Sequence, residues 1–143
     1  MKISKEDRLK VYSKYGGRCA YCGKDIEYED MQIDHLIPQC RAEDGKVSWD
    51  EVNSFSNLMP SCRQCNHYKR ANSLEQFRNA LETIPTKLYR DNYIYRMGSL
   101  YNMWGKNPSK RIPIVFYFEN ESIKQIPGQI SMQELIKENK NGI

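Results

Sequence analysis

Two pairs of cysteines, each with two residues between its members, constrain this chain more than any other feature. The pairs are Cys19 with Cys22 and Cys62 with Cys65, and a fifth cysteine, Cys40, lies between them. Each pair can turn both sulfur atoms toward one point from a tight loop, and two such loops supply the four thiolates of a tetrahedral structural zinc site. Redox pairs or ordinary buried thiols are the alternative, and a cytosolic setting disfavours disulfides. We therefore predict one structural zinc ion on the two pairs and a free thiol at Cys40.

Length and composition place the chain among compact proteins and exclude a large multi-domain machine. Its 143 residues fit one domain or a compact module with an extension. The mean hydropathy of -0.79 leaves no apolar run near the roughly 20 residues of a membrane helix. The first ten residues are polar and charged, unlike a signal peptide. We expect the protein in the cytoplasm.

Basic residues outnumber acidic ones, and their excess is concentrated in one segment. The chain has 22 Lys and Arg against 18 Asp and Glu, for a net charge of +4. Residues 87–111 contain six basic residues and one acidic residue, Asp91. A basic segment of this kind suits an anionic partner such as nucleic acid.

Hydrophobic spacing and capping residues predict a mixed α+β fold. They predict helices over residues 4–15, 94–104 and 131–140, one helical turn over 49–52, and one or two helices over 64–84. They predict short strands over residues 31–34, 57–60 and 112–118. We expect Pro85 to stop the helical segment 64–84. The predicted domains are a core at residues 1–84 and, packed on it, an extension at 85–143 that is mainly helical, with one or two short strands.

The segment between the cysteine pairs is long enough to scaffold a site. Its 39 residues contain Asp34, His35 and Asn57, and Asn66 follows the second pair directly. On an extended strand the side chains of Asp34 and His35 point to opposite faces. The carboxylate can then hold a metal while the imidazole faces a water molecule.

Together these residues resemble the HNH endonucleases of the ββα-metal fold, over about residues 15 to 80. The resemblance implies two short strands and a helix around one catalytic divalent ion, with zinc knuckles bracing the frame. It also implies that His35 is the general base, that Asp34 and Asn66 are metal ligands, and that Asn57 holds the loop of His35. The third position of the motif is Asn66 rather than histidine, so the chain is an HNN variant. His67 is the alternative ligand if the register is shifted by one residue.

The chemistry of phosphodiester hydrolysis agrees with these roles. The reaction needs an activated water, a counter-charge for the phosphorane and help for the leaving oxygen. A histidine with an ordinary pKa of about 6.5 can accept a proton near pH 7. Asp34 and Asn66 offer oxygen atoms that suit Mg²⁺ or Mn²⁺. As in the family, we expect products with 5′-phosphate and 3′-hydroxyl ends.

The leading hypothesis is therefore a metal-dependent endonuclease that nicks or cuts duplex DNA. The alternative is a zinc-stapled, non-catalytic DNA-binding module or an accessory subunit of a DNA-packaging or restriction complex. The expected partners are double-stranded DNA and a protein of a phage or restriction system. Candidate DNA contacts are basic residues beside the presumed site helix or in the basic segment: Arg63, Lys69, Arg70, Arg90, Arg96, Lys106, Lys110 and Arg111. For the tyrosines and tryptophan between residues 88 and 104 we predict core packing rather than base stacking.

Overall fold

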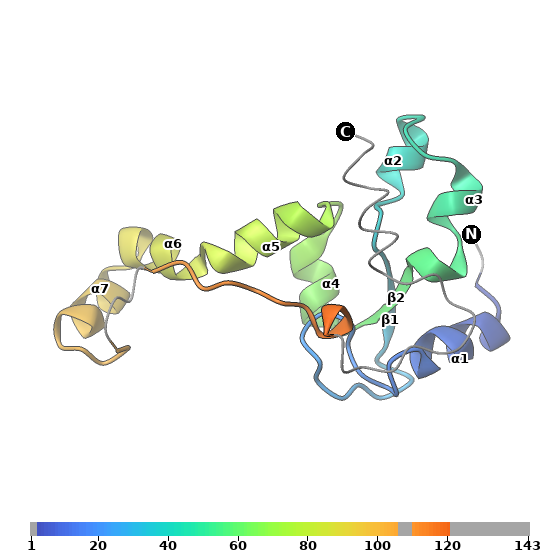
Figure 1. The fold of residues 1–143 in the computed structure, drawn as a ribbon. Helices are drawn as coiled ribbons and strands as arrows, with labels where there is room; N and C mark the ends of the chain where they lie inside the picture. The colour runs from blue at the N-terminus through green and yellow to red at the C-terminus, as the bar shows by residue number, and fades with distance from the viewer. Residues whose placement is uncertain (1–2, 106–109, 121–143) are drawn as a thin grey trace. The chain divides into compact units, whose positions relative to one another are not determined.

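The computed structural model describes residues 3–105 and 110–120. It divides them into two units: residues up to 73 together with those from 115 onward, and residues 74–114. The first unit contains the small sheet and the second contains three helices (Figure 1). The predicted domain boundary after residue 84 stays a prediction. Among the described residues, no helix has the length and apolar character to cross a membrane.

The first unit begins with helix α1, Lys5–Ser13, close to the predicted range. The Ser4 side chain caps it by accepting a hydrogen bond from the Asp7 backbone at 3.0 Å. Just after the helix, the buried Lys14 ammonium donates to the backbone carbonyls of Phe55, Ser56 and Leu58. Burial lowers the pKa of Lys14 to about 8. This lysine therefore ties the end of α1 to the start of the second strand.

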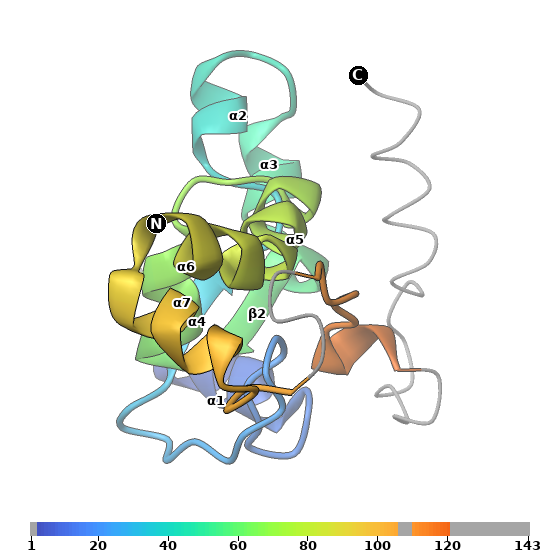
Figure 2. The same cartoon turned by 90° about the vertical axis from the view of Figure 1, so that its left-hand side faces the viewer.

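Two short antiparallel strands form the sheet. Strand β1 is Gln32–His35 and strand β2 is Leu58–Ser61, each shifted by one residue from its predicted range. Asp34 pairs with Met59, and His35 pairs with Leu58. Figures 1 and 2 show α1 near one end of the sheet and the helices between the strands near the other. Those intervening elements are α2, Cys40–Glu43; α3, Trp49–Val52; and η1, Phe55–Asn57.

Helix α4, Arg63–Lys69, follows β2 directly and packs against β1. Its N-cap is Cys62, whose sulfur accepts a hydrogen bond from the Cys65 backbone at 3.5 Å. The second cysteine pair thus lies at the junction of strand and helix. The predicted α+β class and the strand, strand, helix order are both observed.

The segment from residue 112 to 118 does not form the predicted strand. Only two backbone hydrogen bonds join it to the first cysteine loop, from Tyr117 to the Tyr21 carbonyl and from Phe118 to the Ala20 carbonyl. The chain then turns into η2, Tyr117–Glu119. β-Branched and aromatic residues favour extended backbone, but a strand also needs a partner of similar length. The predicted helix at 131–140 lies outside the described residues.

The second unit contains α5, Leu74–Glu82; α6, Ile84–Asp91; and α7, Tyr93–Leu100. Pro85 occupies the first turn of α6 rather than stopping a helix. Proline is well accommodated there, because the first backbone N–H groups of a helix have no partner within it. The expected single stop at Pro85 is therefore corrected to a break just before it, between Glu82 and Ile84.

The tyrosines and the tryptophan between residues 88 and 104 do not form the predicted buried core. Tyr93, Tyr101 and Trp104 are 66%, 71% and 52% exposed. The Trp104 ring stacks on the Tyr95 ring at a centroid distance of 5.7 Å. Three short amphipathic helices present more apolar surface than they can cover among themselves, so the pattern predicts helices correctly and their burial incorrectly.

Candidate functional site: a cysteine cluster beside an aspartate and histidine on one strand

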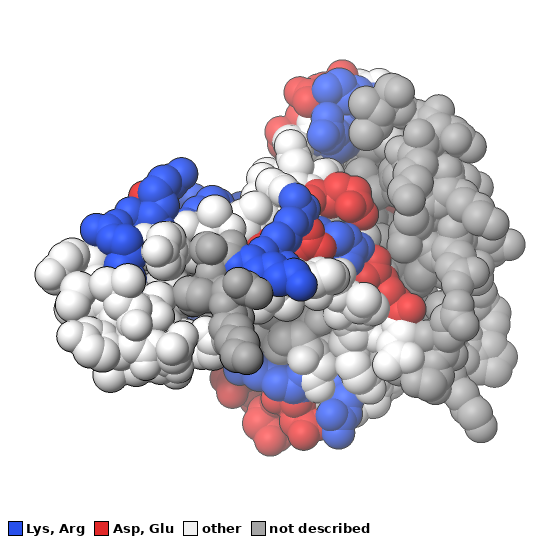
Figure 3. Space-filling view, turned by 60° about the vertical axis from the view of Figure 1, so that its left-hand side comes forward, with Lys and Arg blue, Asp and Glu red and all other residues white. Residues whose placement is uncertain are grey.

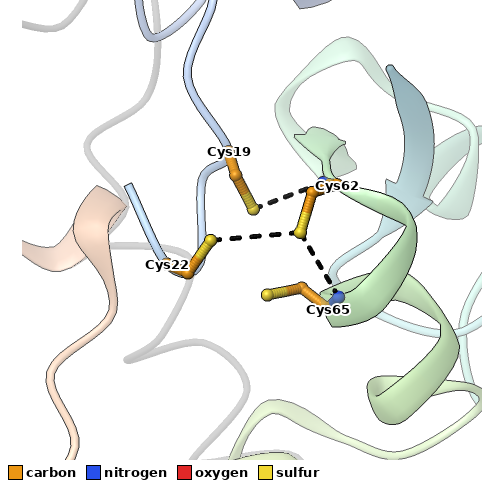
Figure 4. Close-up of side chains that lie close together, drawn as sticks. All are labelled: Cys19, Cys22, Cys62 and Cys65. Carbon is orange, nitrogen blue, oxygen red and sulfur yellow. Dashed lines mark hydrogen bonds between the residues drawn. The ribbon is translucent and has the colours of Figure 1, made fainter. Parts of the chain in front are cut away.

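The two cysteine pairs converge. The four sulfur atoms of Cys19, Cys22, Cys62 and Cys65 lie within 4.8 Å of one another, and none of them forms a disulfide (Figure 4). The sulfur atoms of Cys22 and Cys62 are 3.9 Å apart. Tetrahedral zinc with bonds of about 2.3 Å needs this kind of spacing. Cys40 lies outside the cluster and is free, as predicted.

The electrostatics of the cluster favour bound metal. A hydrogen bond from the Cys65 thiol lowers the pKa of Cys19 to about 4, and backbone N–H groups help. The same hydrogen bond and burial raise the pKa of Cys65. Without a cation the cluster therefore favours a thiolate at Cys19 and protonated thiols at Cys22 and Cys65, because several thiolates so close together repel one another. A divalent cation removes that repulsion, so the cluster could bind a metal ion.

Asp34 is held by two donors that share one of its oxygens. The carboxylate is 7% exposed. Its Oδ2 accepts a hydrogen bond from the Tyr21 hydroxyl and lies 3.0 Å from Nζ of Lys69. In the part of the chain that the structure describes, no hydrogen bond to Oδ1 is found. The carboxylate is thus fixed in orientation with one oxygen left for a further ligand.

Lys69 is part of this site rather than a surface contact. Its side chain is fully buried, and Nζ also donates to the His35 carbonyl at 2.8 Å. Lys69 therefore joins the two adjacent residues of β1 from helix α4. The expectation that it contacts a DNA phosphate is wrong for this geometry, because its ammonium is enclosed and paired.

His35 is half-buried beside Asp34 and faces a different environment. Its Nε2 is buried without a hydrogen-bond partner, and the same holds for Oδ1 of Asn53. Burial lowers the pKa of His35 below its ordinary 6.5, while the Asn53 side chain and the charge of Asp34 act in the opposite direction. The imidazole is therefore neutral at pH 7 and able to accept a proton.

Asn57 anchors the loop that follows His35. The side chain is 2% exposed and makes three hydrogen bonds. Its oxygen accepts from the Ile37 backbone N–H at 2.7 Å, and its nitrogen donates to the carbonyls of Ile37 and Val52 at 3.0 and 2.7 Å. These contacts join both ends of the segment between the strands, which is the geometry expected for a residue holding the His35 loop.

Replacing Asn57 with alanine should lower the free energy of unfolding by about 2 to 4 kcal/mol, because it leaves buried backbone groups without partners. Urea denaturation followed by circular dichroism measures the change. Asn79→Ala is the matched control, since Asn79 is exposed on α5 and its loss should cost no more than about 0.5 kcal/mol. Equal urea midpoints for Asn57→Ala and wild type would contradict this role.

Asn66, rather than His67, faces the strand. The Asn66 amide nitrogen donates to Oε1 of Gln32 at 2.7 Å, and Lys69, one turn later, contacts Asp34. Gln32 and Asp34 lie on the same face of β1, so this side of α4 runs along that face. His67 is exposed. The hydrogen bond to Gln32 fixes the Asn66 amide and leaves its oxygen free to act as a ligand.

The basic residues predicted to contact DNA fall into different settings. Arg63 and Arg70 are exposed on and just after α4. Arg90 pairs with Asp91, and Arg111 pairs with Glu82, whereas Lys110 is exposed. Lys106 lies outside the described residues.

One group of cations is clearly clustered. Lys87, Arg90 and Arg96 all act electrostatically on Asp91, lowering its pKa. Figure 3 shows Lys and Arg side chains gathered over the part of the molecule formed by α6 and α7. Three cations around one carboxylate leave a local positive excess.

Sequence reasoning missed two residues of the site, Tyr21 and Asn53. Tyr21 lies between two cysteines of the cluster, so its proximity to the cluster can be predicted from the sequence. Its partner Asp34 is thirteen residues away, and nothing in the spacing reveals that contact. Asn53 closes helix α3 as its C-cap, a position where asparagine has a purely local explanation.

The site thus combines four cysteines that could bind a metal ion with an aspartate and a histidine that are adjacent on strand β1. Residues 19–82 match the family model described as HNH endonuclease. This part of the chain, under half of its length, is thus similar to HNH endonucleases, in agreement with the resemblance of the motif.

Two Cas9 proteins and one solved Cas9 structure are similar to part of the chain. The chain is 32% identical to the CRISPR-associated endonuclease Cas9 of Corynebacterium diphtheriae, over 43% of this chain and 5% of that protein. It is 35% identical to the Cas9 of Actinomyces naeslundii, over 47% of this chain and 6% of that protein. The crystal structure of the Type II-C Cas9 enzyme from A. naeslundii matches 57% of this chain and 8% of that one, with 31% identity and a TM-score of 0.44. The chain thus spans only a small fraction of the length of these relatives.

Proposed function

We propose that this protein is a metal-dependent DNA endonuclease that hydrolyses phosphodiester bonds in duplex DNA. The observation that carries the proposal is the adjacency of Asp34 and His35 on β1, inside an HNH endonuclease domain. The carboxylate is fixed by Tyr21 and Lys69, and the imidazole is kept neutral by burial. A protein that only bound DNA would not need this pairing.

His35 is the general base in this proposal. A neutral imidazole takes a proton from the attacking water on its unprotonated nitrogen. Nε2 is buried without a hydrogen-bond partner among the described residues, so in this proposal Nδ1 is the nitrogen that accepts the proton. His35 is the last residue of β1, and Asn57 holds the loop that follows it.

Asp34 and Asn66 fit a hard divalent cation such as Mg²⁺ or Mn²⁺. Each offers an oxygen atom without another partner among the described residues, and each side chain is fixed by a hydrogen bond through a different atom. The bound ion would supply positive charge to the scissile phosphate and the leaving oxygen. The Lys69 ammonium lies beside the same carboxylate, orients it and neutralises part of its charge.

Zinc is the metal we propose for the cysteine cluster. Four thiolate ligands at the ends of two tight loops are typical of structural zinc sites, which have no open position for catalysis. The ion would join the first loop to the start of α4 and so hold the strands and helix in place.

The chemical groups left at the ends of the cleaved DNA distinguish this mechanism from others. Attack by water with departure of the 3′ oxygen leaves 5′-phosphate and 3′-hydroxyl ends. Plasmid nicked by the purified protein with Mg²⁺ or Mn²⁺ should therefore be resealed by DNA ligase without pretreatment. Nicks that ligase seals only after removal of a 3′-phosphate would contradict the mechanism.

The alternative function, an accessory DNA-binding subunit of a packaging or restriction complex, is favoured by the cations of the second unit. Lys87, Arg90 and Arg96 surround Asp91 on helices that carry none of the proposed catalytic residues. The same cations serve an endonuclease equally well as a DNA-holding surface. Turnover therefore decides between the two functions.

Changing Lys87, Arg90 and Arg96 together to glutamine should weaken DNA binding and reduce its dependence on salt. Each lost phosphate contact lowers the slope of log affinity against log salt concentration by about 0.9, so a change of about 2 to 3 is expected. Fluorescence anisotropy with duplex DNA measures both quantities. The matched control changes three exposed lysines elsewhere, Lys5, Lys24 and Lys46, to glutamine and so removes the same charge. Identical slopes for the two triple variants would contradict the assignment of this surface.

A further inference from the structure

We infer that Tyr21 is a positioning residue. The cysteine cluster holds Tyr21 in place, and its hydroxyl in turn holds the carboxylate of Asp34. Tyr21 lies between Cys19 and Cys22, and its hydroxyl donates a hydrogen bond to Oδ2 of Asp34. The two proposed metal sites are thus joined by one side chain. The inference rests on the proposed function, because it concerns the carboxylate assigned to the catalytic metal.

The backbone on either side of Tyr21 is fixed by hydrogen bonds. Within the loop, the Cys19 N–H donates to the Lys24 carbonyl and the Gly23 N–H to the Cys19 carbonyl, both at 2.9 Å. The Ala20 N–H donates to the carbonyl of Pro60 in β2 at 2.8 Å. Metal bound by the cysteines would add covalent-strength constraints at both ends of this loop. The position of the tyrosine therefore depends on the loop being closed.

The ring of Tyr21 is also fixed, by packing against two phenylalanine rings. It is 3% exposed and meets Phe116 and Phe118 edge to face, at centroid distances of 5.5 and 6.0 Å. The Tyr21 carbonyl also accepts a hydrogen bond from the Tyr117 N–H at 3.0 Å. Residues 116–118 thus pack against the first cysteine loop. The Tyr21 hydroxyl therefore has little freedom to move away from the carboxylate.

The hydroxyl is one of two donors on the same carboxylate oxygen. Tyr21, in the first cysteine loop, and Lys69, on helix α4, both contact Oδ2 of Asp34. With both in place the plane of the carboxylate is defined, and Oδ1 is presented in one direction.

Packing of the ring in the core is the simpler explanation for the presence of Tyr21. Substitution by phenylalanine distinguishes that explanation from a role of the hydroxyl. Tyr21→Phe keeps the ring and removes only the hydroxyl. Outer partners of metal ligands typically change metal affinity or activity by about 10- to 100-fold. Tyr12→Phe is the matched control, because it also removes a tyrosine hydroxyl hydrogen bond, to the Ile26 carbonyl at 3.0 Å.

The test is Mn²⁺ binding to the zinc-loaded protein without DNA, measured by isothermal titration calorimetry, alongside the rate of plasmid cleavage. We expect Tyr21→Phe to weaken Mn²⁺ binding at least tenfold and to slow cleavage, with zinc content and DNA affinity unchanged and Tm within about 8 °C of wild type. Tyr12→Phe should match wild type. Equal Mn²⁺ affinity and cleavage for Tyr21→Phe and wild type would overturn the inference and leave the proposed function standing.

A wild-type protein that neither binds Mn²⁺ nor cleaves DNA would overturn the proposed function itself, and this inference with it. A measurement on the wild type avoids reliance on the folding of a variant. The Tyr21 hydroxyl proton should appear in the proton NMR spectrum as a slowly exchanging downfield signal, assigned through labelled tyrosine. Its absence from the spectrum of the folded protein would overturn the inference directly.

Discussion

Replacing His35 with alanine should slow DNA cleavage by about 10²- to 10⁴-fold, the contribution typical of a positioned general base. The imidazole is half-buried and burial lowers its pKa below 6.5, so at pH 7 most molecules hold it in the proton-accepting form. Alanine removes the base while leaving the Lys69 bond to the backbone carbonyl of this residue in place. Single-turnover cleavage of a labelled duplex measures the loss.

His67→Ala is the control for this experiment. It removes the other histidine of the chain, which is exposed on α4. We expect it to retain the wild-type rate within a few-fold, and both variants to bind the duplex with wild-type affinity. A His35→Ala protein that cuts at the wild-type rate would contradict the proposed base, and a selective loss in His67→Ala would move the site to that residue.

Replacing Cys62 with serine should unfold the first unit at physiological temperature. Structural zinc contributes about 10 to 16 kcal/mol in small zinc-binding domains, more than the whole stability of most domains. Cys62 is buried, belongs to the cluster and caps α4, so its loss affects the metal and the helix together. Zinc content by atomic absorption and the thermal transition by circular dichroism measure the effect.

Cys40→Ser is the matched control, because Cys40 lies outside the cluster. It should keep one zinc ion per chain and the wild-type Tm. Removing zinc from the wild type with a strong chelator should reproduce the loss seen in Cys62→Ser. Retention of metal and of Tm by Cys62→Ser would contradict a structural role for the cluster.

The parts of the site that the sequence predicted are those with local signals. Cysteine spacing identified the cluster, and alternating residues located both strands to within one position. The adjacency of Asp34 and His35 was visible in the sequence, and adjacency on a strand determines their opposite directions. The role of Asn57 was implied by the family, and its three hydrogen bonds agree with it.

The parts that could not be predicted depend on contacts between distant residues. Lys69 looks like a helix-surface cation in the sequence, and only the packing of α4 on β1 shows that its ammonium is buried against Asp34. The link from Tyr21 to Asp34 is equally invisible in the spacing. Residues 112–118 have strand-forming composition, yet whether they pair is decided by the elements available to them.

Helix boundaries show the same limit. Pro85 was expected to end a helix because proline lacks the N–H that a helix interior needs. The same property suits the first turn of a new helix, and there it is found. The exposed aromatic residues Tyr93, Tyr101 and Trp104 show further that helical periodicity reports a face, not what covers it.

Conversion of supercoiled plasmid by the purified, zinc-loaded protein tests the central claim most directly. With Mg²⁺ or Mn²⁺ the wild type should yield relaxed or linear DNA, and EDTA should abolish the reaction; His35→Ala, run alongside, controls for contaminating nuclease. Supercoiled plasmid that stays intact with either ion, while the protein binds it, would contradict an endonuclease and favour the DNA-binding module.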